Sequence, residues 1–132
     1  AGGASSGFIR FEISPSGIYS PMVEVNGMPW KLLVKRQPFL EVFLYHRESE
    51  CNMWSIDVSV ELTLVNIDRE KNKLCKFDVT FSYEYINWGE DLIEWKDLIN
   101  EEKGFINDGK IIIEARFTLN KIIGIRKTGE VI

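Results

Sequence analysis

The strongest constraint on the fold is a two-residue alternation of apolar and polar side chains in two segments. Between Ser55 and Ile67 the apolar positions of this pattern are Ile56, Val58, Val60, Leu62 and Leu64. Between Cys75 and Tyr85 they are Cys75, Phe77, Val79, Phe81, Tyr83 and Tyr85. Successive side chains of an extended strand point to opposite faces, so this period predicts two half-buried β-strands.

Shorter segments of the same kind, and turns between them, extend the pattern over the chain. Asn26-Gly27 and Asn107-Asp108-Gly109 have the residue chemistry of tight turns. Further strands are expected at residues 8–13, 22–25, 30–35, 39–46 and 111–119. One short helix is expected over Asp91–Ile99, where the apolar spacing is closer to helical. Strands without intervening helices predict an all-β fold, an antiparallel β-sandwich of about eight strands.

The length of 132 residues corresponds to one domain with its own core. Residues 1–7 are small and lack the basic start and apolar stretch of a signal peptide, so we expect a tag or linker there. The domain is predicted over residues 8–120, followed by a C-terminal tail at 121–132. No apolar run approaches the roughly 20 residues of a membrane helix, so no membrane partner is expected.

Charge and cysteine content exclude further classes. A net charge of −4 and a pI near 5.1 argue against nucleic acid, because phosphate binding requires a basic surface. The basic pair Lys35-Arg36 is too small to change that. Cys51 lies in a polar loop and Cys75 at a strand start. We expect both thiols to be reduced, in a cytoplasmic or nuclear protein.

The sequence offers no recognisable catalytic or metal-binding motif. His46, the single histidine, lies at a predicted strand end, and a surface position is expected for it. No nucleophile motif accompanies it, and one histidine with two distant cysteines has no metal-ligand spacing. We therefore expect no enzyme, no metal site and no cofactor. The scattered carboxylates leave a pair for glycoside hydrolysis open.

The alternation that starts at Cys75 breaks at Asn87-Trp88-Gly89. An indole beside a glycine at a strand end is either a core plug or a surface that offers backbone and aromatic area to a partner. The segment with Phe43 and Tyr45 raises a similar question, because these aromatic side chains share one strand face with Glu41. That face is either covered by a loop or part of a binding surface.

With catalysis set aside, a binding module remains. An extended peptide can add to an exposed sheet edge, where main-chain bonds give affinity and side-chain pockets give specificity. The backbone from Tyr85 to Glu90 is predicted to form such an edge, near Phe43 and Tyr45. Within it, glycine would let a peptide backbone approach closely, and the indole would supply an apolar wall.

An ordered set of motifs resembles the MATH (meprin and TRAF homology) domain over about residues 8–120. Besides residues 8–13, the set comprises Tyr19-Ser20-Pro21, Asn26-Gly27-Met28-Pro29-Trp30-Lys31-Leu32, Leu40-Glu41-Val42-Phe43-Leu44, Trp54-Ser55-Ile56, Leu64-Val65-Asn66, Asn87-Trp88-Gly89, Phe105-Ile106-Asn107-Asp108 and Ile113-Glu114-Ala115. The resemblance implies an eight-stranded TRAF-like sandwich that binds short, extended peptide motifs of client proteins in a shallow groove.

The resemblance also implies positions for the peptide-binding residues. The Trp-Gly strand, residues 87–90, would form the groove edge, and Phe43 would lie on its floor. Val60 and Phe81 would be wall positions. Arg36 lies within one position of a basic residue that contacts peptide in some members of the family.

Glu90 departs from the family pattern, because an aromatic residue commonly follows Trp-Gly. The adjoining pocket should therefore be more polar or acidic, and a basic peptide residue beside Glu90 is a reasonable hypothesis. Parent proteins of the family differ in the domains that accompany this one. Some join it to a BTB domain and act as substrate adaptors for cullin-RING ubiquitin ligases, whereas others are ubiquitin-specific proteases.

The favoured interpretation is recognition of substrates for a ubiquitin ligase, with a cullin as partner through a BTB domain. The first alternative is the substrate-binding domain of a ubiquitin-specific protease. The corresponding segment of those proteases is similar to Glu102-Lys103-Gly104-Phe105-Ile106. The alternative from a different class is a sandwich enzyme or a carrier of a small ligand.

Overall fold

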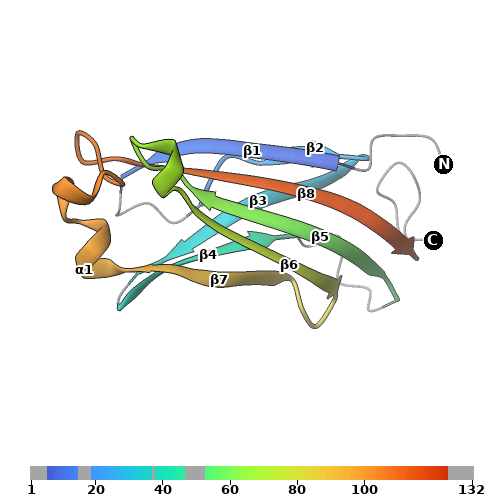
Figure 1. The fold of residues 1–132 in the computed structure, drawn as a ribbon. Helices are drawn as coiled ribbons and strands as arrows, with labels where there is room; N and C mark the ends of the chain where they lie inside the picture. The colour runs from blue at the N-terminus through green and yellow to red at the C-terminus, as the bar shows by residue number, and fades with distance from the viewer. Residues whose placement is uncertain (1–5, 15–18, 37, 47–52, 125–132) are drawn as a thin grey trace.

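The computed structural model describes residues 6–14, 19–36, 38–46 and 53–124. Within them, eight antiparallel strands form two four-stranded sheets that lie as two layers (Figure 1). Their spatial orders are β1-β8-β5-β6 and β2-β3-β4-β7. The predicted class, an all-β antiparallel sandwich with about eight strands and one short helix, is confirmed.

The first sheet comprises β1 (Ser6–Ile13), β8 (Ile111–Ile123), β5 (Ser55–Leu64) and β6 (Lys73–Ser82). The second comprises β2 (Val23–Val25), β3 (Met28–Lys35), β4 (Phe39–Tyr45) and β7 (Asn87–Glu94). The strands β6 and β7 are edge strands of different sheets, and they are in contact on one side of the sandwich (Figure 1). That side is where the two layers meet along a seam.

The period-two pattern of β5 places its apolar side chains in the core. All five predicted inward positions are buried, whereas the residues between them are partly exposed. Trp30 of β3 lies deepest, with no exposed surface. Its ring centroid is 5.2 Å from that of Phe81 and 5.1 Å from that of Phe117. The two sheets are therefore joined by close aromatic packing, which excludes water from the middle of the sandwich.

Two predicted turns have the expected backbone conformation. Asn26 and Gly27 have φ angles of 55° and 78°, and Asp108 and Gly109 have 53° and 73°. Positive φ at both central residues is the mark of a type I′ turn, which asparagine or aspartate followed by glycine tolerates. The first turn joins β2 to β3, and the second precedes β8.

The helix predicted over Asp91–Ile99 is wrong in its first half. β7 continues as a strand to Glu94, and α1 is limited to Trp95–Leu98. β4 supplies a paired ladder for this segment, which a helix of so few residues cannot replace. The register shifts opposite Leu40 and Glu41, and this irregularity interrupts the alternation of apolar residues. The interrupted spacing imitates that of a helix.

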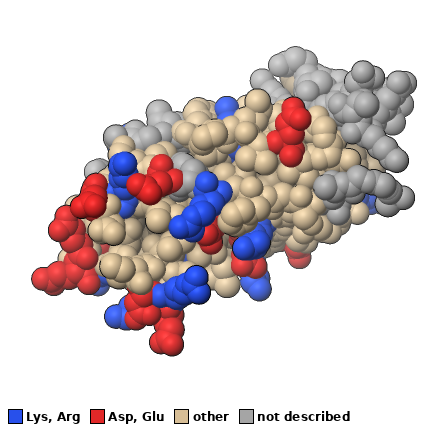
Figure 2. All heavy atoms as spheres, turned by 90° about the horizontal axis from the view of Figure 1, so that it is seen from above, with Lys and Arg blue, Asp and Glu red and all other residues tan. Residues whose placement is uncertain are grey.

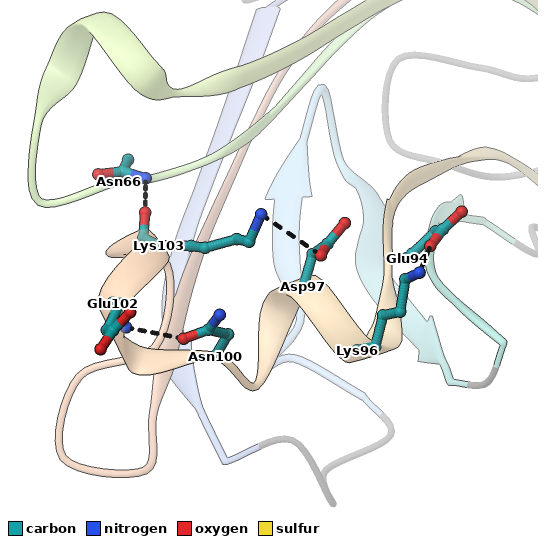
Figure 3. A network of polar contacts seen from close by, with 7 residues as sticks. All are labelled: Asn66, Glu94, Lys96, Asp97, Asn100, Glu102 and Lys103. Atoms are coloured by element: carbon teal, nitrogen blue, oxygen red, sulfur yellow. Dashed lines mark hydrogen bonds and ion pairs between the residues drawn. The ribbon is translucent and has the colours of Figure 1, made fainter.

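A network of polar contacts holds the connection between β7 and β8, which includes the short helical turns α1 and η2 (Glu101–Lys103) (Figure 3). The Lys103 Nζ lies 3.5 Å from Asp97 Oδ1, and the Asn66 amide donates to the Lys103 carbonyl at 2.7 Å. Asn100 Oδ1 accepts from the Glu102 amide at 3.1 Å and caps η2. These contacts fix one end of the sandwich.

The paired strands reach into both predicted terminal segments. β1 begins at Ser6, and β8 continues to Ile123. A side chain at Gly7 would place its Cβ 2.4 Å from Val25 Cγ2 and 2.6 Å from the Phe117 ring, so this glycine fits against the core. The rest of the predicted linker and tail lies outside the described residues, as does Cys51.

The surface position predicted for His46 is wrong. Its side chain is completely buried, and its ring stacks on Trp30 with centroids 4.2 Å apart. Burial lowers its pKa to about 4, so the ring is neutral at pH 7. Nδ1 lies 2.6 Å from the Pro29 carbonyl, which can only accept, so Nδ1 carries the proton. Trp54, which is distant in sequence, covers the ring edge-on at 5.5 Å.

Candidate functional site

The candidate site is the free edge of β7, which pairs with β4 on one side only. The His46 amide donates to the Ile86 carbonyl at 2.9 Å, just before the strand begins. In an antiparallel ladder, residues whose backbone groups bond to the neighbouring strand alternate with residues whose groups point away. Counting from Ile86, the backbone groups of Asn87, Gly89 and Asp91 face the free edge.

The inner face of β7 lies next to β6 at the seam between the two sheets. Trp88 and Glu90 are paired with Leu44 and Val42, whose side chains are buried, so both point to the inner side of the sheet. On β6, Phe77 is packed on the core but is only partly buried. Trp88 and Phe77 therefore offer partly exposed apolar surface at this seam.

Trp88 links β7 to β6 at this seam. Its indole Nε1 donates to the Thr80 carbonyl of β6 at 3.0 Å, which ties the edge strands of the two sheets together. The exposed ring of Tyr85 lies 5.6 Å from the Trp88 ring. Trp88 is thus half-buried, with one part of the ring against the core and another part at the surface.

Glu90 is exposed and places a negative charge on the same side of the sheet. Partial burial, followed by the charge of Glu90, raises the pKa of the Cys75 thiol. The charge of Glu90 on β7 therefore acts on the neighbouring strand β6. Cys75 is a free thiol, and its raised pKa keeps it protonated at pH 7.

The outer face of β7 meets aromatic side chains of β4. Gly89 is paired with Phe43, and Asn87 is paired with Tyr45. A Cβ at position 89 would lie 2.0 Å from the Val42 carbonyl oxygen and 2.6 Å from the Phe43 Cα. The glycine is therefore required for the approach of β4, and not only for the approach of a ligand as expected. It also places no side chain between Phe43 and the free edge.

Lysines lie over these aromatic rings. The Lys35 Nζ is 5.2 Å from the centre of the Phe43 ring, and the Lys31 Nζ is 4.9 Å from that of Tyr45. Tyr45 also contacts the ring of Tyr19 edge-on at 6.2 Å. Of the two alternatives for this face, a covering loop or a binding surface, the contact of Tyr19 with Tyr45 fits a cover over Tyr45.

The MATH domain family model matches residues 9–119 of this chain. The chain belongs to the MATH domain family. Proteins with sequences similar to this chain include BTB and MATH domain-containing proteins 38 and 36 from Caenorhabditis elegans. Each is 26% identical to this MATH domain, over 138 and 151 residues, covering 92% and 96% of the chain. The aligned parts are 35% and 45% of those proteins, so the chain spans less than half of their length.

The structure separates the predicted site residues of this MATH domain into two groups. Around the β7 edge it brings together Phe43, Tyr45, Tyr85, Asn87, Trp88, Gly89 and Glu90. Val60 and Phe81, the expected wall positions, have only 3% and 0% of their surface exposed and belong to the core. Arg36 is exposed, but it follows β3 at the end where β4 pairs with Glu94, far along the strand from Asn87.

Sequence reasoning missed several residues at the edge. Cys75, Phe77 and Val79 fall on the predicted inward face of their strand, but alternation does not show that they are only half-covered. Asp91 was assigned to a helix. Near the end of β7, Lys73 and Ile93 help to line a hollow of about 540 Å³.

Metal binding and membrane spanning are further possibilities for the residues that the structure describes. Within the described residues there is no group of three or more histidine, cysteine or acidic side chains that could hold a metal ion. In that part of the chain, no helix has the length and apolarity needed to cross a bilayer.

Proposed function

We propose that this MATH domain binds short, extended peptide segments of client proteins by adding them as a further strand to β7. MATH domains are protein-interaction modules. The observation that carries the proposal is the free backbone edge at Asn87, Gly89 and Asp91. Unpaired strand edges are templates for strand addition, and main-chain hydrogen bonds supply affinity without regard to sequence.

The two flanks of β7 supply the pockets that such a mode needs. Side chains of an added strand point alternately to the two faces of the sheet. On one face they would meet the partly exposed side chains of Trp88 and Phe77. On the other face they would meet Phe43, which Gly89 leaves open toward the edge. Aromatic surfaces of this kind give large contact areas, and we expect micromolar affinities with a few anchor residues.

The chemistry of the domain supports binding rather than catalysis. The neutral ring of His46 is enclosed by Trp30 and Trp54 inside the core. Its pKa of about 4 makes it a poor base at neutral pH. The raised pKa of Cys75 disfavours a reactive thiolate. The interior between the sheets is filled by aromatic rings, which argues against a carrier of a small ligand.

We further propose that the bound clients are substrates of a ubiquitin ligase, in the cytoplasm or nucleus. The similar proteins from Caenorhabditis elegans carry BTB in their names. The resemblance implies that a BTB domain would bring a cullin as partner. These names favour the BTB combination over the ubiquitin-specific protease.

A peptide-display screen against the domain tests this mode, with Asn87→Pro and Asn87→Ala as paired variants. Proline removes only the edge-facing N–H at this position, and edge strands tolerate proline there. Alanine removes the side chain and retains the N–H. We expect peptides selected on the wild type to bind Asn87→Pro about tenfold more weakly, because a main-chain hydrogen bond is lost and the ring blocks the edge.

Binding to Asn87→Ala should remain close to that of the wild type, as measured by fluorescence polarisation. A thermal melt of each variant controls for folding. Equal binding of Asn87→Pro and the wild type would exclude the β7 edge as the binding site. A screen that enriches no sequence at all would contradict peptide recognition itself.

A further inference from the structure

Three carboxylates surround one short stretch of the β7 edge. Glu90 lies on the inner side of the sheet and is exposed, whereas Asp91 lies on the outer face directly opposite Glu41 of β4. None of the three has an ion-pair partner among the described residues. Farther along the chain, Glu94 and Asp97 are paired with Lys96 and Lys103 at 3.3 and 3.5 Å (Figure 3).

The position of Asp91 opposite Glu41 is unfavourable for the domain alone. Like charges that face each other across two strands destabilise the pair. Lys35 is paired with Glu41 from the other side, but its Nζ lies over the ring of Phe43. On β6, Lys76 lies 3.7 Å from Glu61 and is engaged there. A cation from outside would therefore relieve a repulsion that the described side chains leave in place.

The charge around this stretch has one sign over a longer segment. Residues 90–103 contain six acidic residues and two lysines, so the segment has the same net charge of −4 as the whole chain. Figure 2 shows acidic side chains gathered at the end of the molecule that carries α1 and η2 in Figure 1. A field of this sign attracts basic ligands and raises their association rate.

Strand addition would place successive ligand residues opposite Gly89, Glu90 and Asp91, so these three positions predict part of the ligand sequence. A ligand residue opposite Gly89 would face Phe43 and Lys35, which favours an apolar side chain there. The neighbouring ligand residue, opposite Glu90, would lie on the inner side of the sheet, and the residue beyond it would face Asp91 and Glu41 on the outer side. In a parallel ligand strand these two residues follow the apolar one, and in an antiparallel strand they precede it.

We propose that the preferred clients carry two adjacent basic residues, lysine or arginine, directly next to an apolar residue at these positions. This proposal rests on strand addition to β7 and specifies the ligand of that site. The basic side chain beside the apolar residue pairs with Glu90. The other lies between Asp91 and Glu41, where a guanidinium could bond to both carboxylates.

The test is a selection from a fully randomised ten-residue peptide library against three forms of the domain. These are the wild type, the double variant Glu90→Lys/Asp91→Lys, and the control Glu24→Lys. Glu24 lies on β2 at the opposite edge of the same sheet, so its reversal alters the net charge away from β7. Affinities of the enriched peptides are then measured at low and high salt.

On the wild type and on Glu24→Lys we expect enrichment of two adjacent lysine or arginine residues directly next to an apolar residue. The double variant should bind these peptides at least tenfold more weakly and should enrich aspartate or glutamate instead. Added salt should weaken wild-type binding. Enrichment without a basic pair, or unchanged selection by the double variant, would overturn this inference and leave strand addition intact. Enrichment of no sequence would overturn both.

Discussion

Two tryptophans at inward-facing positions of the same sheet have different structural roles. Trp30 of β3 has no exposed surface and packs against Phe81, Phe117 and His46. Trp88 of β7 is half-buried, and its indole N–H bonds to the backbone of β6. β3 has a neighbour on each side, whereas β7 has one. The place of a strand in its sheet thus decides whether an indole fills a core or forms a boundary.

The largest expected difference between these two residues is in stability. Trp30→Ala should lower the free energy of unfolding by about 3–5 kcal/mol, because it removes a fully buried ring from close packing. Trp88→Ala should cost less, since part of that ring is already in contact with water. Urea unfolding of both variants measures the difference. Equal losses would mean that Trp88 is as much a core residue as Trp30.

The stack of His46 on Trp30 predicts a pH dependence. The unfolded chain binds a proton at His46 near its ordinary pKa of 6.5, whereas the folded state resists protonation down to about 4. Stability should therefore be complete above pH 6.5 and fall as the pH decreases toward 4. Between pH 7 and pH 5 this group accounts for a loss of about 2 kcal/mol.

The variant His46→Phe separates this effect from that of the carboxylates. Phenylalanine retains a stacked ring and cannot be protonated. The difference in unfolding free energy between wild type and variant should change by about 2 kcal/mol from pH 7 to pH 5. Parallel pH profiles for the two proteins would show that His46 is protonated without cost in the folded state.

The smallest effect is expected at the seam between the sheets. Trp88→Phe keeps an aromatic ring and removes the hydrogen bond to Thr80, so the unfolding free energy should decrease by about 1 kcal/mol. Trp95→Phe is the matched control, because the Trp95 indole has no hydrogen bond within the described residues. Chemical denaturation of both variants tests this. The same decrease in both would assign the loss to ring size.

Much of the fold follows from the local pattern, and its exceptions have physical causes. Alternation in β5 and the Asn-Gly and Asp-Gly turns predict strands and hairpins, because these signals depend on neighbouring residues only. The continuation of β7 depends on pairing with β4, which is distant in the chain. His46 is enclosed by Trp30 and Trp54, and no local pattern around position 46 shows that.

The sequence indicates the strand that carries the candidate site, but not which neighbouring positions reach the surface. The break in alternation at Trp88-Gly89 lies within that strand, and the motif order of the family points to the same residues. Val60 and Phe81 were expected in the groove, but their inward positions lie too deep in the sandwich. Asp91 was not predicted as a strand residue, because the bulge interrupts the apolar alternation of β7 and gives it a spacing closer to that of a helix.

The half-buried position of Trp88 has a spectroscopic consequence. The chain has four tryptophans, of which Trp30 and Trp54 are 0% and 2% exposed, so their emission should be insensitive to a surface ligand. Trp88 and Trp95 are partly exposed, and of these two Trp88 is hydrogen-bonded to β6 beside the free edge of β7. In a Trp95→Phe background, a change in intrinsic fluorescence or in acrylamide quenching would therefore report on the β7 edge. The domain carries an optical probe at this edge, without any label.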